Sequence, residues 1–268
     1  MQKLKVRFRY SLVLLRQLVK TDFKLRYQGS VLGYAWSLLR PLLIFLILYI
    51  VFAKFLRFGD AIPNFPIYLL LGIVVWTFFA DMTSQSVSAI VGRGDVIRKM
   101  KIPRWIIPVS TSISALINLG LNLIVVSVFI LVSKSDLLIT GLWLPLILLE
   151  VYILSLGLSF LLSALFVKYR DVSYIWEVVI QAGFYATPII YPLTLITNVT
   201  FQKILLLNPM AQAIQDARYA VVTHQSPTIH TVYESDLVRI IPISICVAFL
   251  IIGVWYFRKE AKNFAENI

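Results

Sequence analysis

Charge, cysteine and histidine are all scarce in this sequence. Only 14% of its 268 residues are charged, and it has one cysteine and two histidines. A single cysteine permits neither an internal disulfide nor a metal site built from several cysteines. The sequence contains no H-E-x-x-H metal motif and no G-x-x-x-x-G-K-S/T phosphate-binding loop. We therefore expect the chain not to be an enzyme and to have no catalytic residues, metal site or cofactor of its own.

Long stretches without charge take up much of the chain. Hydrophobic residues make up 59% of it, and its mean hydropathy is +0.85, whereas a soluble domain has about 45–50% apolar residues. A bilayer core about 30 Å thick requires about 20 mostly apolar residues in a helix. We therefore predict an all-α integral membrane protein with about six transmembrane helices. They cover residues 34–56, 65–91, 105–133, 141–167, 173–191 and 238–257, each approximately.

Basic residues are concentrated in alternate segments between the predicted spans. The chain has 25 Lys and Arg against 13 Asp and Glu, for a net charge of +12. Most of the Lys and Arg precede the first span, follow the last, or lie between spans two and three or four and five. Basic residues in such places orient a membrane chain and contact anionic lipid headgroups, so nucleic acid is not expected as a partner. The same bias predicts that both termini are cytoplasmic.

The residues before the first span predict a basic amphipathic helix over 8–27. Its apolar face carries Phe8, Leu12, Leu15, Val19 and Phe23. Its basic residues are Arg16, Lys20, Lys24 and Arg26. Because a basic amphipathic helix lies in the membrane interface, we expect these four side chains to contact lipid headgroups. They could instead contact an anionic lipid-linked substrate or a partner subunit.

The segment between spans five and six is less polar than a solvated loop. Asn208-Pro209 is a helix-start signal, and an apolar stripe follows it at helical spacing. The stripe consists of Met210, Ala213, Ile214, Ala217 and Val221. We predict short outer helices there that dip into the membrane or rest on it. Pro188 and Pro192 are expected to end or bend span five at its outer end.

Polar residues recur at helical spacing inside three spans. They are Thr77, Asp81, Ser84 and Ser88; Ser110, Ser114, Asn118 and Asn122; and Ser155, Ser159 and Ser163. Small polar residues let helices approach closely and hydrogen-bond to one another. The same stripes could line a water-filled path. The acidic residues Asp81, Glu150 and Glu177 lie in or near spans, where an ionisable group is a candidate for function.

Two features point to partners of other kinds. The segment 92–108 is short, basic and mixed with apolar residues, so it could dock on a soluble protein or serve only to orient the chain. Five aromatic residues of spans one and five could stack on sugar rings or simply pack: Phe45, Tyr49, Phe184, Tyr185 and Tyr191.

Four stretches together resemble one known family, in its order and over nearly the whole chain. They are 24–36 with Arg40-Pro41-Leu42, 97–104, 169–172, and 187–192 with Asn208-Pro209-Met210. In these stretches the chain is similar to the membrane subunits of ABC-2 type exporters of cell-surface polysaccharide. These are the O-antigen, capsule and teichoic-acid permeases.

The resemblance implies a single transmembrane domain over 1–268 in the bacterial cytoplasmic membrane. It implies a homodimer with two cytoplasmic ABC ATPase subunits, which bind the ATP and Mg²⁺, and a lipid-linked glycan as substrate. It places outer gate helices over 193–222, and a translocation path along spans one and five with the five aromatic residues as candidates. It places the coupling helix over 92–104, with Arg93, Asp95, Val96, Ile97, Arg98, Lys99, Lys101, Pro103 and Arg104 as docking residues. The family's usual aromatic residue before the proline of this segment is Ile102 here, which keeps an apolar side chain.

Two other functions fit the same span pattern. One is an ABC-2 exporter of a drug or lipid, and the other is a membrane assembly protein that transports nothing. A neighbouring gene for a Walker-type ATPase would argue against the assembly protein, and neighbouring glycosyltransferase genes would favour polysaccharide over a drug.

The docking segment gives the first prediction. Changing Arg98, Lys99 and Lys101 together to Glu reverses the charge of the predicted coupling helix. We expect the partner ATPase to be lost when the membrane subunit is purified by affinity tag. An unchanged yield of ATPase in that pull-down would contradict the docking role.

Overall fold

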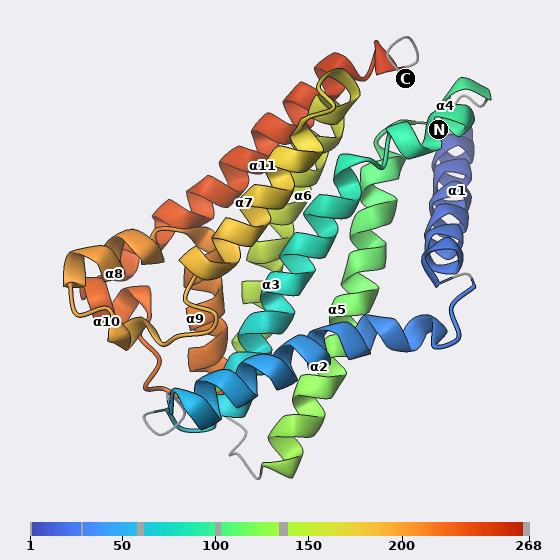
Figure 1. The fold of residues 1–268 in the computed structure, drawn as a ribbon. Helices are drawn as coiled ribbons and strands as arrows, with labels where there is room; N and C mark the ends of the chain where they lie inside the picture. Colours follow the sequence, from blue (N-terminus) through green and yellow to red (C-terminus); the bar gives the residue numbers. More distant parts are fainter. Residues whose placement is uncertain (1, 28, 58–61, 100–102, 134–138, 265–268) are drawn as a thin grey trace.

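The computed structural model describes residues 2–27, 29–57, 62–99, 103–133 and 139–264, and every regular element in these ranges is helical. Five helical segments are long and apolar enough to cross a membrane. They are Gly33–Phe55, Phe65–Val87, Ile106–Val132, Ile139–Lys168 and Leu237–Glu260. The predicted all-α integral membrane class is therefore confirmed (Figure 1).

The helices follow one another with short connections. In chain order the longer ones are α1 (Gln2–Tyr27), α2 (Trp36–Tyr49), α3 (Phe65–Val87), α5 (Ile106–Val132), α6 (Leu144–Lys168), α7 (Val172–Ala186), α9 (Pro209–Val221) and α11 (Ile240–Glu260). The shorter ones are η1 (Gly33–Ala35), the π-helical η2 (Ile50–Phe55), η4 (Val91–Arg93), α4 (Gly94–Lys99), η5 (Ile139–Trp143), η6 (Leu193–Leu195), α8 (Val199–Leu206), α10 (Ile229–Tyr233) and η7 (Asp236–Arg239).

The predicted fifth span is shorter than the sequence suggested. A single span was expected over 173–191, but α7 has 15 residues and ends at Ala186. At 1.5 Å per residue it is about 22 Å long, which is less than the bilayer core of about 30 Å. Thr187 is extended because the ring of Pro188 disfavours a helical residue before it. The prediction that Pro188 ends this helix is confirmed, and the helical assignment of 187–191 is wrong.

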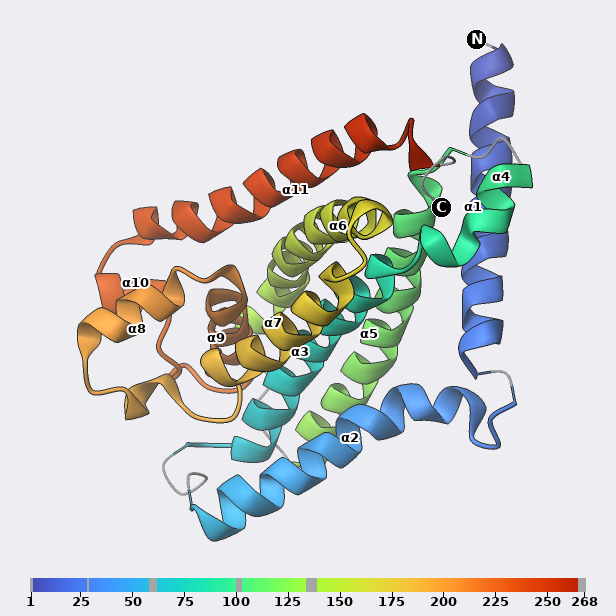
Figure 2. The ribbon, with the colours of Figure 1, turned by 45° about the horizontal axis from the view of Figure 1, so that its top comes forward.

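Helix α3 lies at the centre of the bundle. It packs against α2, α5, α6, α7 and α9, so it is surrounded by neighbours from both halves of the chain (Figures 1 and 2). Most of α3 is buried, whereas only 11% of the first span and 17% of the last are buried. A helix that is apolar on all sides belongs in the interior. The outer faces of the first and last spans are thus left for lipid or for another protein chain.

Two glycines bring α6 and α11 into backbone contact. A Cβ atom on Gly157 would lie 2.5 Å from the Leu250 nitrogen, and one on Gly253 would collide with the Gly157 carbonyl oxygen. Ser155, on the same helix as Gly157, donates to its own helix at the Val151 carbonyl, at 2.7 Å. Ser159 is buried and donates to the Met82 carbonyl on α3 at 3.4 Å. The serine stripe of α6 therefore serves helix packing.

The outer segment forms a buried helix, as predicted. Asn208 caps α9 by accepting from the Met210 N–H at 2.9 Å, and Pro209 occupies the first helical position, where no N–H is needed. Four of the five residues of the predicted apolar stripe are buried and Val221 is half-buried, and the helix packs against α6 and α3. Helix α9 thus dips between the spans, while α8 and α10 lie beside it (Figure 1).

Both ends of the described chain lie at one end of the bundle. The start of α1, the helix α4 and the C-terminal end of α11 are all at the top in Figure 1, together with the end of α6. Helix α1 begins at Gln2, earlier than the predicted residue 8, and it runs alongside α5 near α4 (Figure 2).

The glycine contact predicts a position at which a single methyl group destabilises the bundle. Gly253→Ala places a carbon against the Gly157 carbonyl, and overpacking of this kind costs about 1–3 kcal/mol. We expect a lower unfolding temperature in detergent. The control is Gly120→Ala on α5, where a Cβ atom meets nothing within 4 Å; equal stability of the two variants would contradict the close packing.

Candidate functional site

A polar groove runs along one side of α3 and is bounded by α2 and α7. It consists of two cavities of about 460 Å³ and 480 Å³ that share Arg40 and Asp81. The first lies between α2, α3 and α5, and the second lies between α3 and α7. We call this the α3 groove and define it by its polar side chains: Ser37, Arg40, Thr77, Asp81, Ser84, Ser88, Asn118, Asn122 and Glu177.

Arg40 and Asp81 form an ion pair where the two cavities meet. The Arg40 Nη1 atom lies 4.0 Å from the Asp81 Oδ1 atom, and the two side chains are 69% and 24% exposed. The guanidinium is thus loosely held and faces open space, while the carboxylate is partly covered by the groove wall. Arg40 can reach an anion in the groove without losing a tight protein contact.

The two sequence interpretations of the polar stripes apply to different residues. On α3, Thr77, Asp81, Ser84 and Ser88 all line the groove. On α5 the stripe divides, because the Ser110 and Ser114 hydroxyls donate to carbonyls of their own helix at 2.8 Å and 3.0 Å. Asn118 and Asn122 line the groove instead. Ser110 and Ser114 of the α5 stripe therefore serve the helix itself, whereas the α3 stripe lines the open groove.

The aromatic residues predicted for the path fall into two groups. On α2, Phe45 is buried and its ring centroid is 5.7 Å from that of Tyr49. On α7, Phe184 packs against Trp76 and Tyr185, with centroid distances of 6.1 Å and 5.4 Å. The two groups lie on the two helices that border the groove.

Their exposure differs. Tyr185 is 60% exposed, and the Tyr191 hydroxyl donates to the Tyr185 and Ala186 carbonyls at the end of α7. Tyr185 is accessible to a ligand, whereas Phe45 serves the core. The role of all five aromatic residues in transport stays a prediction.

Sequence reasoning missed several groove residues. Trp36 and Trp176 line the groove, and neither is among the candidate residues of the sequence analysis. The Trp176 indole N–H donates to the Thr83 hydroxyl at 3.1 Å, which ties α7 to α3. Arg40 has two sequence signals: it is a charge inside the first predicted span, and it belongs to the first stretch that resembles the family.

The predicted docking segment has an anchored side and an exposed side. Ile97 is buried and belongs to an apolar cluster that also contains Ile90, Ile107, Phe160 and Phe257. Asp95 and Arg98 are exposed. Pro103 and Arg104 are half-buried at the start of α5. Lys101 lies outside the described residues, as do the side chains of Val96 and Lys99.

Arg93 faces the protein interior. Its guanidinium is ion-paired with Asp22 of α1, and the two side chains are 17% and 19% exposed. The Ser110 hydroxyl donates to the other carboxylate oxygen of Asp22 at 3.4 Å. Asp22 therefore joins three segments: α1, η4 and α5. The role of Arg93 in docking stays a prediction, but its guanidinium is already ion-paired with Asp22 of the same chain.

The basic residues of α1 remain accessible. Arg16, Lys20 and Lys24 are exposed, and the side chain of Arg26 lies outside the described residues. Their contact with lipid headgroups stays a prediction.

Arg218 of α9 is the most deeply buried charge in the described part of the chain. Its side chain is 0% exposed and donates to four acceptors: the carbonyls of Tyr68, Pro188 and Ile189 and the Gln215 side chain, at 2.5–3.1 Å. Its guanidinium carbon lies 3.6 Å from the centre of the Tyr68 ring. A Cβ atom on Gly72 would be 2.6 Å from an Arg218 nitrogen, so this glycine leaves room for the guanidinium.

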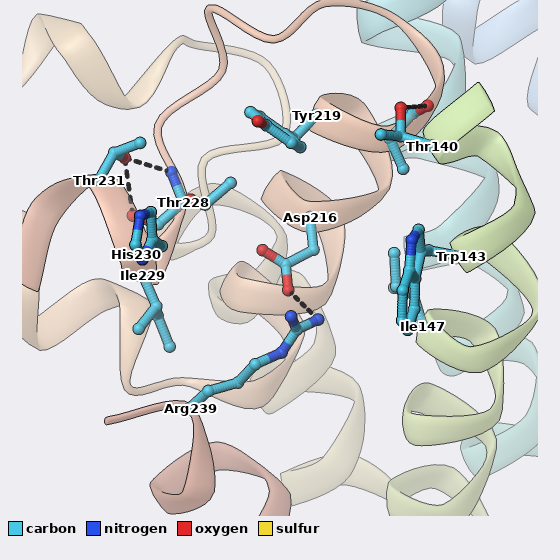
Figure 3. A pocket seen from close by; sticks show the side chains of 11 residues that line it. Thr140, Trp143, Ile147, Asp216, Tyr219, Thr228, Ile229, His230, Thr231 and Arg239 are labelled. Atoms are coloured by element: carbon cyan, nitrogen blue, oxygen red, sulfur yellow. Dashed lines mark hydrogen bonds and ion pairs between the residues drawn. The ribbon is translucent and has the colours of Figure 1, made fainter. Parts of the chain in front are cut away.

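A separate cavity outside the α3 groove, of about 330 Å³, lies beside α9 on the side of η5, α10 and η7 (Figure 3). Asp216 of α9 accepts from Gln212 and is ion-paired with Arg239 of η7, and both contacts are 2.6 Å to the Oδ2 atom. Burial raises the pKa of the Asp216 carboxyl, and Arg239 and the Gln212 hydrogen bond act in the opposite direction. No metal-binding cluster of three or more His, Cys, Asp or Glu occurs among the described residues.

A family model described as ABC-2 type transporter matches residues 13–222. This chain belongs to the ABC-2 type transporter family. The matched range contains the helices that border the α3 groove, the docking segment and α9.

Curated relatives of this ABC-2 chain match over nearly its full length. The O-antigen export system permease protein RfbA of Myxococcus xanthus is 28% identical over 263 residues, which is 95% of each chain. The O-antigen export system permease protein RfbA of Klebsiella pneumoniae is 29% identical over 265 residues, which is 98% of each chain.

The Arg218 contacts predict a large loss of stability on truncation. Arg218→Ala leaves the carbonyls of Pro188 and Ile189 without a donor, and each unsatisfied buried group costs about 1–3 kcal/mol. We expect a loss of at least about 2 kcal/mol, measured as thermal unfolding in detergent. Lys203→Ala, which removes a half-buried charge of α8 on the same side of the bundle, is the control; a wild-type unfolding temperature for Arg218→Ala would contradict the prediction.

Proposed function

We propose that this chain is the transmembrane subunit of an ATP-driven exporter of lipid-linked polysaccharide. It works as a homodimer with two cytoplasmic ABC ATPase subunits, and it lies in the bacterial cytoplasmic membrane. The support comes from its family, from the printed names of its near full-length relatives, and from the α3 groove. Both termini are cytoplasmic in this proposal.

The α3 groove is the observation that carries the proposal. Hydroxyl, amide and carboxylate groups inside a bundle of apolar helices are costly unless they contact water, a ligand or one another. A polysaccharide is a chain of hydroxyl groups, which donate to and accept from such side chains. A drug-like or lipid substrate would be better matched by an apolar wall, so the groove favours the glycan over the ABC-2 alternatives.

The chain needs to bind and guide its substrate, not to change it. Arg40, exposed at the junction of the two cavities, is placed to pair with a phosphate that links the glycan to its lipid. Thr77, Asn118 and Asn122 offer hydrogen bonds to the sugars that follow. Tyr185 offers an exposed ring at the far end of α7 for stacking.

In this proposal, the partner ATPase acts on the membrane subunit through α4. Asp95 and Arg98 are exposed and available to the ATPase, while Ile97 is buried in an apolar cluster of the membrane subunit. ATP binding can drive transport only if the ATPase contacts differ between two states of the membrane subunit. Helix α4 lies between α3 and α5 in the chain, so a displaced α4 would shift two of the helices that border the groove.

The distribution of Lys and Arg supports the proposed orientation, with both termini in the cytoplasm. Helix α4, the ends of α6 and α11 and the start of α1 share one end of the bundle, and the Lys and Arg of the sequence are concentrated in these segments (Figure 1). The positive-inside rule assigns that end to the cytoplasm.

Arg40 provides the test of the proposed function. Arg40→Ala removes the phosphate contact, and the loss of one charge-assisted hydrogen bond corresponds to about a tenfold slower export. Glycan at the cell surface and lipid-linked glycan retained inside are measured together. Lys54→Ala is the control, because it removes an exposed charge of the same span that does not line the groove.

Three results of this test would each contradict a different part of the proposal. Normal surface glycan in Arg40→Ala removes Arg40 from the path. An equal defect in Lys54→Ala shows a general effect of charge on the span. Normal surface glycan in cells that lack the whole chain overturns the export function itself.

A further inference from the structure

The cavity beside α9 lies where two spans begin. Its wall includes Trp143 of η5, just before α6, and Arg239 of η7, just before α11. The segments that cross the membrane start at Ile139 and Leu237. The cavity is therefore at the level of a membrane boundary, at the end of the bundle opposite α4 (Figures 1 and 3).

The interior of this cavity carries charges of both signs. Arg239 supplies a guanidinium that is 44% exposed, and Asp216 supplies a carboxylate that is 10% exposed. A ligand with only a phosphate would thus meet the acidic group as well as the positive one. A ligand that carries a phosphate and an ammonium group is matched at both ends.

Aromatic rings stand beside the acidic group. Trp143 lies across the cavity from Asp216, and Tyr219 is one turn further along α9 (Figure 3). A cation is attracted to the faces of such rings, and Trp is the strongest of them. The hydroxyl groups of Thr140 and Thr231 also border the cavity; they donate to the Ala220 and Thr228 carbonyls, which leaves their oxygens with acceptor capacity. The upper part of the cavity therefore suits a primary ammonium group.

Uncovered apolar side chains lie close in the chain to Trp143 and Arg239, and we call them the apolar rim. Ile139 and Leu142 of η5 are 85% and 79% exposed, and Leu237 of η7 and Ile240 of α11 are 75% and 58% exposed. Exposed apolar side chains at the start of a span contact acyl chains, and an exposed tryptophan at this level is typical of the lipid interface.

We propose that this cavity binds the headgroup of a zwitterionic phospholipid with a primary ammonium group, as in phosphatidylethanolamine. The Arg239 guanidinium binds the phosphate. The Asp216 carboxylate and the Trp143 and Tyr219 rings bind the ammonium group. The acyl chains lie over the apolar rim formed by Ile139, Leu142, Leu237 and Ile240. With the proposed orientation, the lipid belongs to the outer leaflet.

The site links a lipid to the outer helices. Asp216 is on α9, two residues before Arg218, and Arg239 directly precedes α11. A bound headgroup adds contacts between α9, η5 and η7 and therefore stabilises their observed arrangement. The inference goes beyond the transported substrate, because lipid binding would take place whether or not the chain exports a glycan.

The experiment measures lipid retention directly. The purified protein is stripped of lipid in detergent and incubated with phosphatidylethanolamine, phosphatidylglycerol or phosphatidylcholine, and bound lipid is counted by native mass spectrometry. We expect phosphatidylethanolamine to be retained about tenfold better than the other two, as for one charge-assisted contact. Water-soluble glycerophosphoethanolamine, which lacks acyl chains, is expected to compete poorly.

Three variants and two controls locate the site. Asp216→Asn, Arg239→Gln and Trp143→Ala should each lose about tenfold in retention of phosphatidylethanolamine. Asp216→Asn keeps the shape of the side chain, and Trp143 is 61% exposed, so these two variants decide the outcome if Arg239→Gln fails to fold. The controls are Lys203→Gln, for an outer charge away from the cavity, and Trp255→Ala, for a tryptophan that is 60% exposed at the other end of α11.

Each other outcome overturns a stated part of the inference. Equal retention of phosphatidylglycerol shows that the ammonium group is not recognised. Equal retention of phosphatidylcholine removes the requirement for a primary ammonium. Equal competition by glycerophosphoethanolamine replaces the lipid by a soluble ligand, and equal losses in the controls or unchanged binding in Asp216→Asn and Trp143→Ala remove the site from this cavity.

Discussion

The contacts of the Arg218 guanidinium hold the outer part of this protein to its centre. Four acceptors from α3, from α9 and from the turn after α7 converge on one fully buried side chain. A charge in this position is stable only while every acceptor stays in place. The end of α7, the depth of α9 and the central position of α3 are therefore fixed together. The same contacts position α7, which forms one wall of the α3 groove.

Composition and periodicity predicted the class of the fold, and proline and asparagine predicted several helix ends. The long apolar runs gave five of the spans, Pro188 marked the end of α7, and Asn208-Pro209 marked the start of α9. Span five was predicted too long because hydropathy continues through 187–191 while the backbone cannot continue as a helix there. Hydropathy measures how well residues tolerate lipid, and it carries no information on whether they form one helix.

The candidate site was only partly visible in the sequence. The stripe of Thr77, Asp81, Ser84 and Ser88 was found by its spacing, but packing and a water-lined path predict the same spacing. The choice depends on which helices stand beside α3, and that is set by contacts between distant residues. Arg40 with Asp81 and Asp22 with Arg93 are pairs of this kind, separated by many residues that periodicity does not connect.

The ion pair of Asp22 with Arg93 has a mechanical consequence. Helix α4 begins directly after Arg93, and α1 carries Asp22 near its C-terminal end. Any force that pulls α4 out of place must either drag α1 with it or separate two opposite charges that are mostly shielded from water. Because the separation is costly, we expect α1 to move together with α4, and α1 leads directly into the first span.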